Sequence, residues 1–242
     1  MLHRRVETHG CGVLLLCVSV LGVAASPAPP PTWTRSFVTR VEALAVLQSL
    51  NADLLSHDSA TLTLQRWCEV HKLASPVKIT AVRVLDVDKA PTAEQRVELG
   101  VSPSEPVRYR RVKLTCGAVV LSEADNWYVP GRLTPEMNRQ LEGSDTPFGL
   151  VVRPLHFQRH TLSSTLLWLP LPAGWEMNGA GAGAGAGAGV DAVRRVGGGE
   201  DQPMPSRLLE HRAVLTLPDG TPFSEVVETY TDQVLAFPVP SP

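Results

Sequence analysis

The sequence predicts an α+β protein with one antiparallel sheet. Three observations support this class: a helical pattern near the N-terminus, later segments rich in β-branched residues, and short turns that join most of those segments as hairpins. Helices followed by strands favour an α+β fold over a parallel α/β fold. The chain has 242 residues, of which 43% are hydrophobic, so one domain with one substantial core is expected.

Two helices are expected at the start of this domain. Residues 36–56 carry apolar side chains three and four positions apart, which is the spacing of one helix face. Asp58 and Ser59 can cap a second helix over residues 61–70. The apolar positions of the first helix are Val41, Leu44, Leu47, Leu50 and Leu54.

Most of the remaining chain predicts strands. Residues 107–116 and 119–129 are typical of a hairpin with its turn near Gly117. Residues 218–220 (Pro-Asp-Gly) predict the turn of a second hairpin. The expected strands are 77–86, 107–116, 119–129, 155–169, 207–217 and 223–234, and short helices are expected over 92–99 and 134–141.

Residues 172–206 break this pattern, because Gly and Ala alternate from Gly179 to Gly189. Silk-like Gly-Ala repeats can form sheets, but this run is short, and ordering glycine is entropically costly. We therefore expect a flexible surface insertion at 172–206 within a single domain that spans residues 36–238.

The N-terminus indicates export. His3, Arg4 and Arg5 give the chain a positive start, and an apolar run extends from Val13 to Val23. Small residues up to Ala25 are suited to cleavage after that position. This apolar run is too short to span a bilayer comfortably, so we expect a signal peptide over 1–25, a Pro-rich linker over 26–35 and no stable membrane insertion after cleavage. The mature protein would be periplasmic or secreted, or cytoplasmic if the start codon is wrongly chosen.

The charge balance argues against a nucleic-acid partner. Lys and Arg number 22 against 24 Asp and Glu, with a net charge of -2. The chain has no Walker-type phosphate loop and no dinucleotide fingerprint, and its serines lie in no nucleophile-elbow motif. We expect no cofactor.

Cleavage of the signal peptide would leave Cys68 and Cys116. They could pair in an oxidising compartment. We expect two separate buried thiols instead, because neither has the spacing of a metal or redox motif. His156 and His160 would share one face of a strand without a third ligand, so no metal site is expected.

Arginines interrupt the strand expected over 107–116. Alternation places Arg108 and Arg110 on one face and Arg111 on the other, and neither face is fully apolar. At least one Arg should therefore be partly covered, where its guanidinium needs an anionic partner. A ligand carboxylate can be that partner through two parallel hydrogen bonds. The alternative is that the apolar part of each Arg side chain lies along the strand while its guanidinium group reaches water.

The last strand presents a carboxyl group in a similar position. Glu228 lies between Val226 and Tyr230 on one face. A carboxyl group held among apolar side chains favours its protonated form and can donate a proton. A cross-strand ion pair or an exposed edge position is the alternative.

Five pieces of sequence, in order, resemble the chorismate pyruvate-lyase family. They share with it a Leu-rich helix end, an arginine-bearing strand, a Trp…Gly-Arg strand end, a Thr-Pro turn and a closing strand with a Glu. The resemblance covers about residues 40–235 apart from the insertion. The pieces are 54–61 (LLSHDSAT), 108–116 (RYRRVKLTC), 127–132 (WYVPGR), 146–149 (TPFG), and 219–222 with 227–230 (DGTP and VETY).

This resemblance implies a six-stranded antiparallel sheet with helices that cover an enclosed ligand pocket. It also implies roles: Arg111 would hold the carboxylate of chorismate or 4-hydroxybenzoate, Glu228 would transfer a proton, and Arg132 would be a second anion-binding group. Phe148 and Gly149 would contact the ring. Pyruvate would leave, and no cofactor would be needed.

Three functions stay open. The first is a chorismate lyase-like enzyme, the second is a non-catalytic binding protein for a small aromatic carboxylate in the cell envelope, and the third is a structural or interaction role in the envelope. Effector-binding domains of some bacterial regulators share this fold, but no helix-turn-helix region is expected ahead of the domain. Glu225 is the alternative to Glu228 as the site carboxylate.

Overall fold

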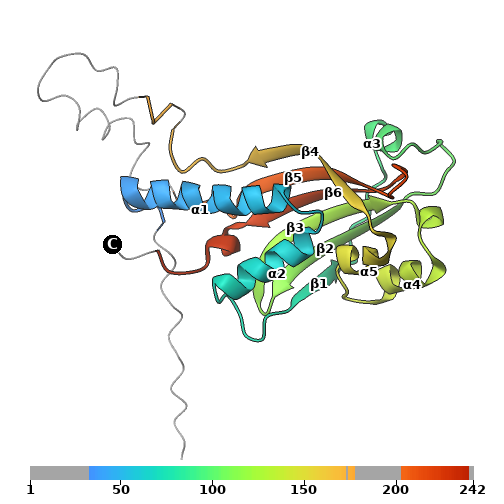
Figure 1. Ribbon diagram of the computed structural model, residues 1–242, viewed down its shortest axis with the longest axis horizontal. Coiled ribbons are helices and arrows are strands. Elements are labelled where there is room, and N and C mark those ends of the chain that lie inside the picture. Colours follow the sequence, from blue (N-terminus) through green and yellow to red (C-terminus); the bar gives the residue numbers. More distant parts are fainter. Residues whose placement is uncertain (1–32, 173, 178–202, 240–242) are drawn as a thin grey trace, which may run out of the picture.

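The computed structural model describes residues 33–172, 174–177 and 203–239. Six strands form one sheet in the order β1-β2-β3-β6-β5-β4, and all neighbours are antiparallel (Figure 1). The predicted α+β class with a six-stranded antiparallel sheet is therefore confirmed. The strands are β1 (Ile79–Val84), β2 (Arg108–Cys116), β3 (Val119–Tyr128), β4 (Gln158–Leu166), β5 (Arg207–Thr216) and β6 (Pro222–Thr231).

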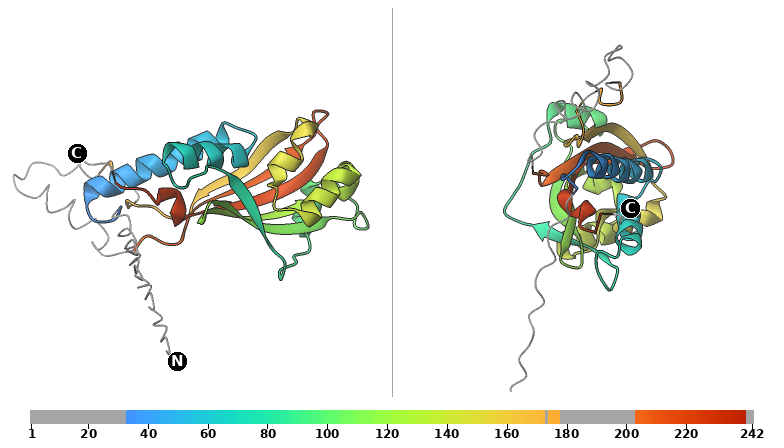
Figure 2. Two further views of the ribbon diagram at one scale, coloured as in Figure 1. Left: turned by 90° about the horizontal axis from the view of Figure 1, so that it is seen from below. Right: turned by 90° about the vertical axis from the view of Figure 1, so that its left-hand side faces the viewer.

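The two N-terminal helices run along one face of this sheet (Figure 2). Each begins at a serine whose hydroxyl accepts a main-chain N–H, Ser36 from Thr39 and Ser59 from Leu62. The helices are α1 (Phe37–Leu55), α2 (Ala60–Val70), α3 (Ala93–Glu98), α4 (Pro135–Gly143) and α5 (Phe148–Val151), with short 3-10 turns η1 (Pro130–Arg132), η2 (Arg153–Leu155) and η3 (Asp232–Leu235).

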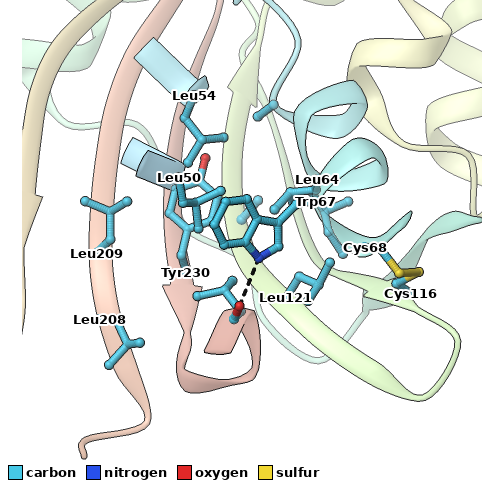
Figure 3. Packing of buried hydrophobic residues seen from close by; sticks show 14 of the residues in the cluster. Leu50, Leu54, Leu64, Trp67, Cys68, Cys116, Leu121, Leu208, Leu209 and Tyr230 are labelled. Carbon is cyan, nitrogen blue, oxygen red and sulfur yellow. Dashed lines mark hydrogen bonds between the residues drawn. A yellow bond between two sulfur atoms is a disulfide. The ribbon is translucent and has the colours of Figure 1, made fainter. Parts of the chain in front are cut away.

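The main core lies between these two helices and the sheet (Figure 3). The apolar stripe of α1 includes Leu50 and Leu54, which are 0% and 1% exposed, as the three-and-four spacing predicts. Trp67 of α2 is also buried, and its indole N–H donates to the carbonyl of Val234 at 2.9 Å. This bond joins α2 to η3 at the far end of the chain.

Cys68 and Cys116 form a disulfide, so the expectation of two separate thiols is wrong. Cys68 is in α2 and Cys116 ends β2, and both are fully buried. The packing of α2 on the sheet brings their Cα atoms to 6.6 Å, within the range that a disulfide can bridge. Sequence spacing could not reveal this approach, because it depends on how a helix docks on a distant strand.

Register gives the helix-covered face of the sheet a defined row of residues. Val112, Ala124, Glu228 and His211 are cross-strand partners on β2, β3, β6 and β5 in turn. All four are at most 5% exposed. A carboxyl group and an imidazole are thus held within an otherwise apolar row.

The predicted signal peptide and the run from Gly179 to Gly189 lie outside the residues that the structure describes. Within the described residues, no helix has both the length and the apolar character that a membrane crossing requires.

Candidate functional site

A buried ion pair lies on the helix-covered face of the sheet. The Arg159 guanidinium on β4 lies 2.6 Å from a Glu228 carboxylate oxygen on β6, with side-chain exposures of 5% and 7%. The hydroxyl of Tyr230 donates to the same oxygen at 3.1 Å. Burial and the adjacent carboxylate raise the pKa of Tyr230, so this hydroxyl stays a hydrogen-bond donor.

Carboxylates bind both the main chain and the side chain of Arg159, but its Nε donor is left without a partner within the described part of the chain. Its main-chain N–H donates to the Asp58 carboxylate at 2.9 Å, just ahead of α2. Burial opposes the charged form of its side chain, but the carboxylate of Glu228 more than offsets that effect and the pKa of Arg159 is raised. Its Nε atom is buried and has no hydrogen-bond partner among the described residues. A buried donor left unpaired in this way is costly unless a ligand or water accepts from it.

A cavity of about 50 Å³ opens beside this pair. Its walls combine the first residues of α2 and α5 with apolar side chains of the sheet. This volume is below the roughly 300–1,000 Å³ typical of sites for drug-sized molecules, so any occupant is compact or displaces side chains. Its wall includes Ser59, Thr61, Arg110, Asn126, Phe148 and Phe157.

Arg110 adds a second guanidinium to this wall. It is 6% exposed, and its Nε atom donates to the carbonyl of Leu141 at 3.1 Å. Burial lowers its pKa to about 10, so it remains a cation at neutral pH. In the part of the chain that the structure describes, Arg110 has no ion pair with a carboxylate. Arg159 and Glu228 neutralise each other, and the other carboxylate among the lining residues, that of Asp58, is exposed. Arg110 is therefore a buried cation of the wall that no buried carboxylate among the described residues balances.

Asn126 contributes an unpaired acceptor. Its amide nitrogen donates to the Ser224 hydroxyl at 3.0 Å, and its Oδ1 atom is buried without a partner among the described residues. The residues of the cavity wall therefore include a buried unpaired donor, Arg159 Nε, and a buried unpaired acceptor, Asn126 Oδ1.

The structure does not bring Arg111 and Glu228 together, which corrects the expected pairing. Arg111 lies on the opposite face of the sheet, where it forms ion pairs with Glu123 at 3.3 Å and Asp125 at 3.7 Å. Consecutive strand residues point to opposite faces, so a shift of one position separates Arg110, which lines the cavity, from Arg111, which does not.

The other expected ligand-binding residues divide between two places. Phe148 and Gly149, at the start of α5, line the cavity. Arg132 lies elsewhere: its guanidinium donates to the carbonyls of Leu99 and Gly100 at 2.6 and 3.1 Å. Arg132 thus holds the loop after α3 in place and is not in the cavity wall.

Glu225, the alternative carboxylate, is also on the opposite face. It is fully buried beneath α3 and accepts from Arg212 at 2.8 Å and from Gln95 at 3.2 Å. Glu228 is therefore the carboxylate of β6 that faces the cavity.

A serine, a histidine and an asparagine meet under α1, but not as a nucleophile and its base. The Nε2 atom of His211 lies 2.7 Å from the side-chain oxygen Oδ1 of Asn51 and 3.1 Å from the Ser164 hydroxyl, which also donates to that oxygen. Because an amide oxygen only accepts, Nε2 carries the proton and cannot take one from the serine. Burial lowers the pKa of His211 to about 4, so the ring is neutral.

Of the two arginines in the cavity wall, one could have been found from the sequence. Arg110 shares a face with apolar Val112, so alternation alone marked it as a candidate for burial. Arg159 carried no signal, because its approach to Glu228 depends on the pairing of β4, β5 and β6 over 69 positions of sequence. No group of three or more metal-binding side chains occurs in the described ranges.

Comparison with known proteins gives one relative of high similarity. The uncharacterized protein y4mC of Sinorhizobium fredii (strain NBRC 101917 / NGR234) is 53% identical over 209 residues, which are 86% of this chain and 83% of the relative. No family model matches the chain.

Solved structures resemble the chain at much lower identity. PhnF from Mycobacterium smegmatis is 14% identical with a TM-score of 0.43, over 76% of this chain and 69% of PhnF. The possible transcriptional regulator YydK from Bacillus subtilis is 14% identical with a TM-score of 0.37, over 68% of this chain and 62% of YydK. The chain thus spans less than two thirds of YydK, and a likeness of this size says nothing of a ligand.

Proposed function

The chain belongs to the family of the uncharacterized protein y4mC of Sinorhizobium fredii, and we propose that it binds a small aromatic carboxylate in the cavity beside Arg159 and Glu228. The observation that carries this proposal is the free Nε donor of Arg159 in a wall that also holds the buried guanidinium of Arg110. A carboxylate supplies the missing acceptor and the balancing charge.

The start of α2 supports the same ligand charge. Ser59 caps this helix, and Ser59, Ala60 and Thr61 all line the cavity. The first main-chain N–H groups of a helix have no acceptor within the helix, and its dipole places about half a positive charge there. With Arg110 and Arg159, this end of α2 makes a binding place for one carboxylate group.

The rest of the cavity suits an aromatic ring. Phe148 and Phe157 face it from the α5 side, and Val226 faces it from the sheet. Because the cavity is small, admission of a ring requires these two phenylalanine side chains to shift. Asn126 Oδ1 would then accept a hydrogen bond from a hydroxyl group on the ring. Among the ligands that the family resemblance suggests, 4-hydroxybenzoate meets all of these demands.

Carbon-oxygen lyase activity on chorismate is the second candidate. The specific observation in its favour is that a carboxyl group, that of Glu228, faces the same cavity. In that reaction the enolpyruvyl ether bond would break, pyruvate would leave and the ring would become aromatic. Against it, both Arg159 and Tyr230 already bind one Glu228 oxygen, so proton transfer by that oxygen would require the ion pair to open. We therefore prefer binding without turnover.

We further propose that the protein is exported. The disulfide between Cys68 and Cys116 supports this location, since disulfides persist in oxidising compartments. The N-terminal sequence pattern supports it independently. Chorismate is made and used in the cytoplasm, so export also favours a binding role over the lyase reaction.

Titration calorimetry with 4-hydroxybenzoate tests the binding proposal, and incubation with chorismate followed by pyruvate detection tests turnover. We expect 4-hydroxybenzoate to bind and pyruvate not to be released. Release of pyruvate by the protein but not by its Glu228→Gln variant would replace binding with catalysis. Absence of both binding and release would overturn both candidates.

A further inference from the structure

A second cavity, of about 290 Å³, lies at the other end of β2 from the disulfide. Strand β1 stops at Val84, which pairs with Arg111, so Arg108–Arg110 extend beyond it without a β1 partner. The cavity occupies this open corner between the sheet and the end of α4. Arg110 lines it as well as the first cavity.

Two arginines of this cavity carry charges that no carboxylate pairs with. Arg83 donates to the carbonyl of Glu142, and Arg110 donates to the neighbouring carbonyl of Leu141, both at the C-terminal end of α4. That helix end supplies only about half a negative charge against two positive charges. Neither guanidinium forms an ion pair with a carboxylate within the described residues. Burial lowers the pKa of Arg110, the nearby charge of Arg83 lowers it further, and Asp145 opposes this effect.

The remaining charges of the cavity do not remove this excess. Arg111 is balanced by ion pairs with Glu123 and Asp125, and Glu142 is balanced by Arg108. Asp88 also lines the cavity, but it is exposed and forms no ion pair with any described residue. Water and salt screen an exposed carboxylate, so it offsets the two guanidinium groups weakly.

A third polar group faces the same space. Tyr128 is 2% exposed, and its ring packs against Phe148 with 5.7 Å between centroids. Its hydroxyl has no hydrogen-bond partner in the described ranges, and the residue lines the cavity. Burial raises the pKa of Tyr128, so the hydroxyl keeps its proton and remains a donor.

We propose that this corner is a second binding site, which takes a phosphate group, either as inorganic phosphate or on a phosphate monoester. Arg83 and Arg110 bind its oxygens, and the hydroxyl of Tyr128 donates a further hydrogen bond. A phosphate group presents several terminal oxygens and up to two negative charges, which match two guanidinium groups and a hydroxyl better than one carboxylate does. Leu85, which is 77% exposed, and Val87 form an apolar wall for the organic part of an ester.

Calorimetry at pH 7.5 and constant ionic strength tests this site with inorganic phosphate and with phenyl phosphate. Both should bind, and Arg83→Gln should weaken binding about tenfold or more, because a charge-assisted bond is lost. Tyr128→Phe, which keeps the ring and its packing, should weaken it about fivefold. Arg139→Gln removes an exposed cation of α4 outside the cavity and should leave binding unchanged.

Three results would overturn the proposal. One is no binding of either probe by the native protein at tens of millimolar. Another is an equal loss of phosphate affinity in Arg83→Gln and Arg139→Gln, which would mean that the anion is attracted to the positive charges of the surface in general. The third is loss of phosphate binding in Arg159→Gln with retention in both Arg83→Gln and Tyr128→Phe, which would place the anion in the first cavity. Thermal unfolding of each variant, recorded first, shows whether it is folded.

Discussion

Arg159 and Glu228 form an ion pair at 2.6 Å in which both side chains are more than nine-tenths buried. They come from β4 and β6, which are separated in the sheet by β5. The pair therefore spans the full width of one strand beneath the helices. The pair forms only when all three strands are in register. Because the Nε atom of Arg159 has no partner among the described residues, Arg159 is also a candidate ligand-binding residue.

Removal of one member of this pair should destabilise the fold strongly. Glu228→Gln leaves the Arg159 charge buried without a counter-ion, which typically costs about 3–5 kcal/mol. Urea unfolding measures the change in free energy. The double variant Arg159→Met/Glu228→Leu should be more stable than Glu228→Gln, because it leaves no unpaired charge. A double variant at least as unstable as Glu228→Gln would contradict this account of the pair.

Loss of the disulfide should also lower stability. Cys68 and Cys116 are 48 positions apart, and the entropy of closing a loop of that length corresponds to about 4 kcal/mol. The double variant Cys68→Ala/Cys116→Ala should unfold at correspondingly lower urea concentration. Unfolding of the native protein under a strong reductant is the matched control and should approach the same midpoint. A reductant without effect on unfolding would mean that the bond contributes nothing.

Acid should weaken the fold through His211. Its pKa is about 4 in the folded protein and about 6.5 when unfolded, so the unfolded chain binds more protons between these values. This contribution to stability is fully present above pH 6.5 and is lost as the pH falls toward 4. Between pH 7 and pH 5 the loss should be about 2 kcal/mol.

The variant His211→Gln isolates this effect, since it keeps a side-chain N–H for Asn51 and removes the titration. Chemical unfolding of both proteins at pH 7 and pH 5 gives the comparison. If both proteins lose the same free energy over this range, His211 is not the group responsible.

Asn126 should set the preference for a hydroxyl on the ligand. One neutral hydrogen bond contributes about 1 kcal/mol, so Asn126→Ala should weaken 4-hydroxybenzoate about fivefold and leave benzoate nearly unchanged. Calorimetry with both acids gives the ratio. An unchanged ratio of the two affinities would show that Asn126 does not contact the hydroxyl, while the binding proposal itself would stand.

The fold was largely accessible from the sequence, because its elements rest on local patterns. The apolar spacing in α1 and the alternation in β2 and β3 follow from the periods of helix and strand. The capping serine of α2 gave its start within one residue. The edge strand β4 was expected over 155–169 and spans Gln158–Leu166, since η2 ends at Leu155 and His156 has a left-handed backbone.

The site was less accessible, because it depends on contacts between distant residues. Alternation separated Arg110 from Arg111 correctly, but only the docking of α2 and α5 shows which face encloses a cavity. The family resemblance pointed to Arg111, one position away. Arg159 could not be found without the pairing of β4 to β5, and the Cys68–Cys116 bond needed the placement of a helix on a strand.

The central claim is that Arg159, and not Arg111, anchors a small aromatic carboxylate. Calorimetry with 4-hydroxybenzoate on two matched variants tests it most directly, since Arg159→Gln and Arg111→Gln remove the same charge from opposite faces of one sheet. We expect a loss of affinity of about tenfold or more in a folded Arg159→Gln protein and no significant loss in Arg111→Gln. Equal affinities in the two variants, or a larger loss in Arg111→Gln, would contradict it.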